Sequence, residues 1–423
     1  MQIDPGRYLD PDRNAITMIP AIALSMMVFA YSVIFGPISV LMFYGFWLPA
    51  FLLRPQLLLR QSGLVIVLLL IPFVATLSMF WSQAPSTTMR AGIQYGTTVF
   101  CGLVAARLVS VSNLMVGGLL GGLLVLLYSW FNGSSAYDVV DGTYTFVGAF
   151  GSKNQLGYFA SLTILFAIGV GIIFRAVWGL RLLAALIGLF AAQVLLMSDS
   201  ATSVLTLLFA IGIVFIARGL FALPEALRRL TILVLMALGL AIALSAVQLG
   251  AFDAILSAFN KDPTLTGRTY LWNRGITIGG ENPFLGLGYN AFWIHDHPPA
   301  EELWREFYIT GRTGFHFHNT LIEAYVGLGM LGVAIMGLLT LSLLVFPIRV
   351  MMNRHATGGA IMCAGLSLLF LVRSTVEIDY FTPYTAGSFL VPFLLLKMSD
   401  SRRLEKTLKR KPAQPNQPRI VAV

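Results

Sequence analysis

The sequence is dominated by apolar stretches of about 20 residues, the length that crosses the hydrocarbon core of a bilayer as an α-helix. Backbone groups must bond within such a segment because no water is present, so these stretches predict helices. Hydrophobic residues make up 57% and charged residues 11% of the chain, too little polar surface to cover a soluble globule. We therefore predict an all-α polytopic membrane protein, whose first partner is the lipid bilayer.

About twelve transmembrane helices fit the pattern. The expected spans are residues 16–35, 38–53, 64–80, 91–109, 114–131, 155–174, 180–198, 201–217, 230–250, 318–347, 359–377 and 383–397. They divide the chain into parts that we expect as follows: a cytoplasmic tail (1–15), helices 1–9 (16–250), a large periplasmic catalytic loop (251–317), helices 10–12 (318–397) and a basic cytoplasmic tail (398–423).

The positive charge follows from this topology. The chain carries 28 Lys and Arg against 19 Asp and Glu. With the N-terminus inside, most of the Lys and Arg fall in the inner connectors and the C-terminal tail, as the positive-inside rule requires. Nucleic acid is therefore not an expected partner. The connector 251–317 then faces the periplasm of a bacterial inner membrane, and function is expected there. Within it, residues 300–309 predict an amphipathic helix lying on the membrane surface.

The start of the predicted sixth helix offers a binding site for an anion. Ser152 can cap this helix, and Lys153 and Asn154 lie near the positive end of its dipole, where a diphosphate would be attracted. A lysine that extends to the membrane surface beside an ordinary cap explains the same pattern equally well.

The periplasmic loop offers a second group of candidates. Arg268 has a forked guanidinium suited to phosphate oxygens, and Trp272 offers a ring face to a sugar or to a packing partner. Gly286 and Gly288 would let the backbone approach a ligand closely. An ordinary loop with turns would also account for these residues.

A histidine opens the predicted tenth helix. His318 can accept a proton from a sugar hydroxyl near neutral pH, and Asn319 and Glu323 share one face beside it. A histidine that only caps a helix is the structural alternative. Further along, Arg373 and Glu377 can pair at helical spacing and face the same outer cavity, or form a purely structural salt bridge.

A zinc site has to be weighed because His295, His297, His316 and His318 place four imidazoles in one loop. No cysteine accompanies them, and histidines separated by one residue are a weak pattern for metal. We therefore predict no metal and no cofactor.

These segments together resemble the O-antigen ligase and Wzy polymerase superfamily, and within it the ExoQ-like exopolysaccharide polymerases. His318-Asn319 is followed by nine residues and then Gly329-Met330-Leu331-Gly332, a spacing typical of the ligases. The ExoQ-like signature is matched by Asp262 to Thr269 with Trp272, by Lys153-Asn154 with Leu156-Gly157, and by Asn282-Pro283 to Gly288. The resemblance covers residues 148 to 384.

The resemblance implies a metal-independent, inverting glycosyl transfer from an undecaprenyl-diphosphate-linked saccharide donor to a saccharide acceptor. Arg268 and His318 would be catalytic, with His318 as the base, and Arg268, Lys153 and Arg373 would hold the diphosphate. The remaining substrate-binding candidates are Asn154, Asn319, Glu323, Trp272, Gly286 and Gly288. The roles of Arg90, Arg274 and Arg312 stay open.

Three functions compete. The ExoQ-like loop favours a polymerase that joins lipid-linked repeat units into exopolysaccharide, with other polysaccharide assembly proteins as further partners. An O-antigen ligase would instead transfer finished glycan to lipid A core or protein. A flippase for the same lipid-linked saccharide is the transporter alternative, but transporters place ionisable residues near the bilayer midplane, whereas here they gather at one face.

Overall fold

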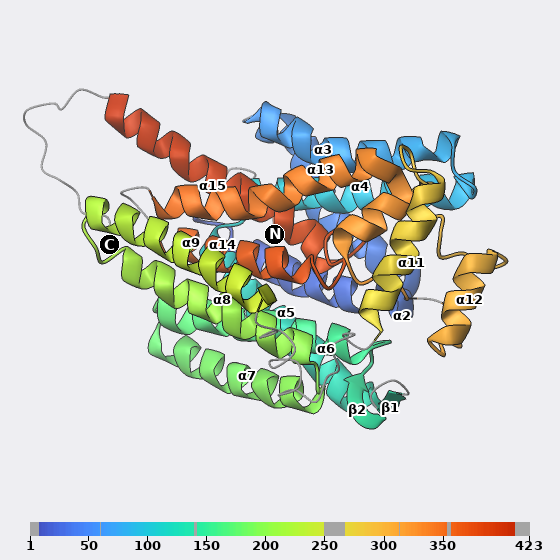
Figure 1. Ribbon diagram of the computed structural model, residues 1–423. Coiled ribbons are helices and arrows are strands. Elements are labelled where there is room, and N and C mark those ends of the chain that lie inside the picture. The colour runs from blue at the N-terminus through green and yellow to red at the C-terminus, as the bar shows by residue number, and fades with distance from the viewer. Residues whose placement is uncertain are drawn as a thin grey trace, which may run out of the picture.

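The computed structural model describes residues 8–59, 61–138, 142–248, 267–312, 314–352 and 357–410. Long helices run alongside one another in one bundle, and α11, α12 and the β1–β2 hairpin lie at one end of it (Figure 1). In the described part, seven helices are long and apolar enough to cross a membrane. The chain is therefore a mostly helical, multi-pass membrane protein, as the apolar stretches predicted.

The helical elements are α2 (Ala15–Leu53), η1 (Pro55–Leu57), α3 (Ser62–Leu77), η2 (Ser78–Phe80), α4 (Pro85–Leu108), α5 (Val111–Asn132), α6 (Lys153–Ile168), η3 (Gly169–Ile173), α7 (Trp178–Met197), α8 (Ala201–Leu220), α9 (Glu225–Gln248), α11 (Arg268–Glu281), α12 (Pro298–Glu306), α13 (Thr320–Met351), α14 (Gly358–Arg373) and α15 (Ala386–Arg410).

Helix α2 is a hairpin of two antiparallel arms and not one long rod. The indole nitrogen of Trp47 donates a hydrogen bond to Ser25 Oγ at 3.1 Å, although a straight helix would separate these residues by roughly 33 Å. The chain reverses at Gly36, whose φ of 62° suits glycine, and Pro37 cannot donate the hydrogen bond that would continue the first arm. The two arms match the first two spans expected from the sequence.

Helix α13 differs from the expected tenth span, 318–347, which was drawn as one continuous helix. It is broken at Gly329, where φ is 62°. A Cβ at this glycine would lie 2.3 Å from the carbonyl carbon of Phe284. The apolar pattern runs through the break without interruption, so hydrophobicity alone could not reveal it. The short first piece, before the break, belongs to the site, and the longer second piece runs in the bundle.

A two-stranded antiparallel hairpin was not expected. Strand β1 (Ser134–Asp138) pairs with β2 (Thr143–Gly148), with Tyr137 opposite Tyr144. The signal was present in the alternating aromatic and β-branched residues around Gly142, whose φ is 67°. The hairpin leads directly into the start of α6.

Helices α11 and α12 form a small unit with its own apolar core. Leu303 and Trp304 of α12 are buried together with Leu271 of α11 and with Phe317. The predicted amphipathic helix therefore exists as α12, but its apolar face is covered by protein. Tyr308, which falls in the predicted range but beyond the end of α12, is largely exposed.

The last helix extends further than expected. Helix α15 continues to Arg410, past the expected end of the final span at Lys397. The added residues include Leu, Glu, Lys and Arg, whose intrinsic helix propensity is high even where no apolar pattern predicts a helix. The first part of the basic tail is thus helical.

Candidate active site

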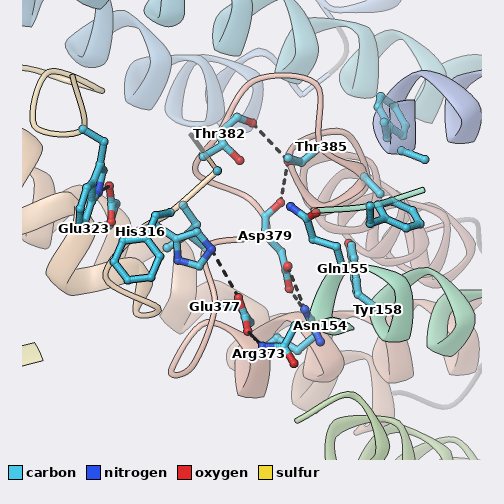
Figure 2. A pocket seen from close by; sticks show the side chains of 18 of the residues that line it. Asn154, Gln155, Tyr158, His316, Glu323, Arg373, Glu377, Asp379, Thr382 and Thr385 are labelled. Carbon is cyan, nitrogen blue, oxygen red and sulfur yellow. Dashed lines mark hydrogen bonds and ion pairs between the residues drawn. The ribbon is translucent and has the colours of Figure 1, made fainter. Parts of the chain in front are cut away.

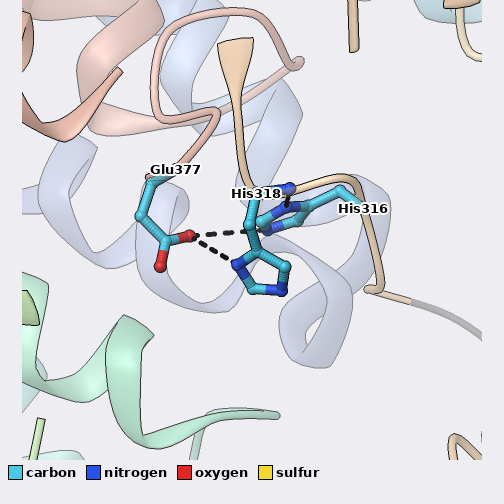
Figure 3. A group of neighbouring side chains, drawn as sticks. All are labelled: His316, His318 and Glu377. Atoms are coloured by element: carbon cyan, nitrogen blue, oxygen red, sulfur yellow. Dashed lines mark hydrogen bonds and ion pairs between the residues drawn. The ribbon is translucent and has the colours of Figure 1, made fainter. Parts of the chain in front are cut away.

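Two histidines and one glutamate form the centre of the site. The Nδ1 atom of His318 lies 3.4 Å from Glu377 Oε2, and the Nε2 atom of His316 lies 3.6 Å from the same oxygen; both are ion-pair distances without hydrogen-bond geometry. Figure 3 shows both rings on one side of the carboxylate, with the second ring nitrogen of His318 pointing away from it. The backbone N–H of His318 donates to His316 Nδ1 at 3.0 Å, so neutral His316 carries its proton on Nε2.

The local sequence forces His318 into this position. Its φ of 51° lies in the left-handed region, which a non-glycine residue occupies only when its surroundings impose it. Asn319 then caps α13, because its Oδ1 accepts from the backbone N–H groups of Leu321 and Ile322. Its Nδ2 donates to the Thr375 carbonyl at 3.1 Å. Asn319 thus fixes the turn that presents the histidine, and a role in substrate binding stays a prediction.

The loop that carries Glu377 is joined to the histidine turn by backbone contacts. The N–H of Thr320 donates to the Ser374 carbonyl at 2.9 Å, and the Thr320 hydroxyl donates to the Glu377 carbonyl at 2.8 Å. Thr320 is fully buried. These contacts set the distance between the His318 and Glu377 side chains.

Glu377 is held by residues far away in the sequence. Arg268 Nη2 donates to Glu377 Oε1 at 2.8 Å, and both side chains are less than one-tenth exposed. Asn154 Nδ2 donates to the same oxygen at 3.2 Å, and the Ser200 hydroxyl donates to Asn154 Oδ1 at 2.8 Å, which fixes the amide orientation. Oε1 is therefore occupied by donors, while Oε2 faces the histidines.

The expected pairing of Arg373 with Glu377 is wrong. Helix α14 ends at Arg373, and although the Glu377 N–H still donates to the Arg373 carbonyl at 2.7 Å, the Glu377 side chain turns to Arg268. Arg373 instead pairs with Asp379 through Nε and through Nη2, the latter at 3.1 Å from Oδ1. Its guanidinium carbon lies 4.3 Å from the centre of the Tyr158 ring. Its Nη1 is buried and has no hydrogen-bond partner among the described residues.

Electrostatics favour an ionised glutamate beside neutral His316. Burial alone would raise the pKa of Glu377, but His318 and Arg268 outweigh it and hold that pKa below its ordinary value. Burial, together with His318, lowers the pKa of His316 to about 3. Glu377 is therefore an anionic acceptor at neutral pH, and His316 is a neutral neighbour.

These groups border a cavity of about 390 Å³. Figure 2 shows His316 and Glu323 on one side of it and Asn154, Tyr158 and Asp379 on the other. Its described lining is Phe29, Ala30, Phe150, Asn154, Gln155, Tyr158, Phe159, Asn290, Trp293, Trp304, Arg312, Gly314, Phe315, His316, Glu323, Arg373, Glu377, Ile378, Asp379, Thr382, Thr385 and Ala386. The expected residues Asn154, Glu323 and Arg373 are among them. Arg268 and His318 are not part of the described lining, but both contact Glu377, which is.

Other expected residues lie elsewhere. Gly286 and Gly288 are packed against the backbone near residue 327 and against Ser82, where a Cβ would approach to 2.6 Å and 2.3 Å. Trp272 is half-buried on α11. Lys153 is the first residue of α6, with Ser152 as the cap that the sequence predicted. These four residues are not part of the described lining, so their ligand roles stay predictions.

The three arginines whose roles were open lie in different surroundings. Arg312 lines the cavity and pairs with Glu301 at 3.2 Å. Arg274 pairs with Glu302 on the outside of α12 at 2.5 Å. Arg90 is exposed on α4. Only Arg312 is therefore placed to contact a bound molecule in this cavity.

Some residues of the site were not identified from the sequence. Ser200, Trp293 and Phe315 were not singled out, and Glu377 was assigned the wrong partner. Asp199, whose φ is 47°, lies in the tight turn between α7 and α8, and this turn explains how Ser200 reaches Asn154. Trp293 and Phe315 carried no local signal beyond being aromatic residues in the loop.

The four imidazoles do not gather into one metal site. Among the described residues, the group whose ligand atoms lie within 4.8 Å of one another is His316, His318 and Glu377. His297 Nδ1 is instead 2.8 Å from the Phe292 carbonyl oxygen. A cation at the three-residue group would face the buried Arg268 guanidinium that already neutralises Glu377.

Comparison with known proteins decides the family. A family model described as O-antigen ligase matches residues 186–337. Over 405 residues the chain is 41% identical to the exopolysaccharide production protein ExoQ of Rhizobium meliloti (strain 1021), covering 95% of this chain and 93% of that protein. The chain belongs to the ExoQ-like O-antigen ligase family. It is thus a multi-pass membrane protein of a polymerase and ligase family, as the resemblance in the loop indicated.

The ExoQ-like assignment and the site geometry overlap only in part. The region matched by the O-antigen ligase model contains Arg268 and His318. Asn154, Arg373 and Glu377, which complete the site in space, lie outside that region. The structure thus places next to Arg268 and His318 three residues that lie outside the matched region.

Proposed function

We propose that this chain polymerises undecaprenyl-diphosphate-linked oligosaccharide repeat units into exopolysaccharide at the periplasmic face of the inner membrane. The observation that carries the proposal is the contact between His318 Nδ1 and Glu377 Oε2. A carboxylate at Nδ1 holds the proton on that atom and leaves Nε2 as a base. The likeness to ExoQ over most of the chain supports a polymerase.

The reaction is a single displacement. His318 Nε2 takes the proton of an acceptor hydroxyl while the hydroxyl oxygen attacks the anomeric carbon of the donor. The bond from that carbon to the diphosphate oxygen breaks, and the lipid diphosphate leaves with the electron pair. Attack opposite the leaving group inverts the anomeric centre. Glu377 stabilises the imidazolium that forms, and Arg268 and Asn154 keep Glu377 in place.

The leaving group needs a positive charge, which Arg373 supplies in this proposal. Its guanidinium lines the cavity, and its Nη1 is buried without a partner among the described residues. Fixed cations in a buried site stabilise a developing anion without reorganising, so no metal ion is required. Arg268 has the different task of holding the carboxylate, although the sequence suggested that it would contact the diphosphate.

Substitution of the base tests the proposal. His318→Ala should abolish long polymer, seen on gels of extracted polysaccharide, while membrane insertion stays normal on immunoblots. His295→Ala is the matched control, because His295 is exposed and lies outside the cluster. Polymer of normal length from the His318 variant would contradict the proposal.

Mass spectrometry of the lipid-linked glycan in a deletion strain separates the alternatives. Single repeat units that face the periplasm are expected for a polymerase. Full-length lipid-linked chains would indicate the ligase, which transfers finished glycan to lipid A core or protein. Single repeat units that stay on the cytoplasmic side would indicate a flippase.

A further inference from the structure

One wall of the cavity is built from aromatic side chains of the loop between α11 and α13. Trp293, Trp304 and Phe315 all contribute to it. The Trp293 ring centre lies 5.2 Å from that of Phe315 and 6.1 Å from that of Trp304. Trp293 and Phe315 are partly exposed and offer apolar ring surface to the cavity, whereas Trp304 is 2% exposed.

The aromatic wall lies beside the proposed base. The ring of Phe315 is centred 6.0 Å from the ring of His318, in an edge-on arrangement. A sugar ring packed on Phe315 would therefore lie close to His318. The diphosphate-binding candidate Arg373 belongs to a different element, α14, and the aromatic wall contains no side chain from it.

The aromatic wall also holds polar groups with spare bonding capacity. The Trp293 indole N–H and the Phe317 backbone N–H donate to the two oxygens of Glu323, at 3.2 Å and 3.0 Å. Each carboxylate oxygen can accept a further hydrogen bond. The Trp304 side chain is 2% exposed, and its Nε1 is buried with no hydrogen-bond partner among the described residues. A buried donor without an acceptor is costly, which favours a ligand that supplies one.

We propose that the aromatic wall is the subsite for the terminal pyranose of the acceptor glycan, an inference that rests on the proposed function. A pyranose has apolar C–H faces that pack on aromatic rings and a rim of hydroxyls that both donate and accept. Its hydroxyls satisfy the Trp304 N–H and the Glu323 carboxylate. A prenyl chain would leave both of these groups unsatisfied, and a diphosphate would find no cation among the three side chains of the aromatic wall.

A binding experiment on the full-length chain tests this subsite without requiring turnover. The probe is the phosphate-free oligosaccharide released by mild acid from the cell's own lipid-linked repeat unit, and binding to detergent-purified protein is followed by equilibrium dialysis. Trp304→Phe keeps the ring and removes the N–H, so binding should weaken about fivefold, the size of one neutral hydrogen bond. Phe315→Leu keeps an apolar side chain but removes the flat ring, and should weaken binding about tenfold.

The control and the competing ligands give the result its meaning. Trp178→Phe, at an exposed position on α7, should bind the oligosaccharide like the unaltered protein. Inorganic pyrophosphate should not displace the oligosaccharide. Displacement by pyrophosphate, binding of undecaprenyl phosphate in place of the oligosaccharide, or unchanged binding in both wall variants would overturn the subsite. The assay measures binding and not turnover, so failure of the catalytic proposal and failure of the subsite are separate outcomes.

Discussion

The substitution Glu377→Gln should disable the base while preserving the shape of the site. Arg268 and Asn154 both donate to Oε1, so the new amide must keep its oxygen there and turn its NH₂ group toward the histidines. His318 Nδ1 would then accept a hydrogen bond, and the ring proton would move to Nε2. His316 Nε2–H would also face a second donor.

Glu377→Gln should affect both the reaction rate, through the lost base, and stability, through the lost counter-charge of Arg268. A histidine that carries its proton on Nε2 cannot take one from the acceptor hydroxyl, so the rate should fall by about 10²–10⁴-fold, the usual contribution of a general base. The buried Arg268 would lose its counter-charge, which costs roughly 3 kcal/mol of stability when a buried pair is broken. Activity should therefore fall far more than the amount of inserted protein.

The assay is polymer formation in proteoliposomes supplied with the lipid-linked repeat unit, corrected for protein content. Glu306→Gln is the matched control, because it makes the same chemical change at an exposed position on α12. Glu377→Asp keeps the charge at a longer distance and should retain more activity than Glu377→Gln. A Glu377→Gln protein that polymerises at the unaltered rate would refute the orienting role of the carboxylate.

Three further outcomes are expected. Gly329→Ala should destabilise the protein by about 3 kcal/mol or more and lower its amount in membranes, because this position combines a positive φ with a crowded Cβ. Gly337→Ala, with open space around the Cβ, should be tolerated. Equal amounts of the two variants on immunoblots would contradict the prediction. Burial lowers the pKa of His316 to about 3 from an ordinary 6.5, so below pH 6.5 the unfolded chain binds a proton that the folded chain does not, and stability falls. In His316→Gln, melting temperatures measured at pH 7 and pH 5 should therefore differ less than in the unaltered protein. An equal difference would disprove the assignment. Ser200→Ala frees the amide of Asn154 and should lower the polymerisation rate per inserted protein about fivefold, the effect of one hydrogen bond. Ser200 also caps α8, so the amount of inserted protein is measured alongside; no change in the corrected rate would show that the orientation of this amide is unimportant.

The helices could be predicted from the sequence because long apolar stretches have few alternatives in a bilayer. Even the reversal at Gly36 was foreseen as a boundary between two spans, since Gly and Pro interrupt the pattern there. The break at Gly329 was missed because the residues on both sides are equally apolar. Its cause is a tertiary contact with the backbone of Phe284, which no local pattern records.

The residues that meet at Glu377 were singled out from the sequence, but their pairing was not. His318, Arg268 and Asn154 all lie next to this carboxylate, and their catalytic and binding roles stay predictions. The pairing was assigned by local spacing, which favoured Arg373, whereas the actual partner Arg268 lies 109 residues away. Sequence spacing describes helical neighbours well, but α14 ends at Arg373, and beyond a helix end that spacing no longer applies.

Thr320 and Asn319 fasten the histidine turn to the loop after α14, whereas the aromatic wall reaches α13 through Glu323. If the two proposals hold, proton removal and glycan choice depend on different contacts of the chain. Replacing residues 290–315 by those of a relative that makes a different polysaccharide should change which acceptor glycan is used while glycosyl transfer continues.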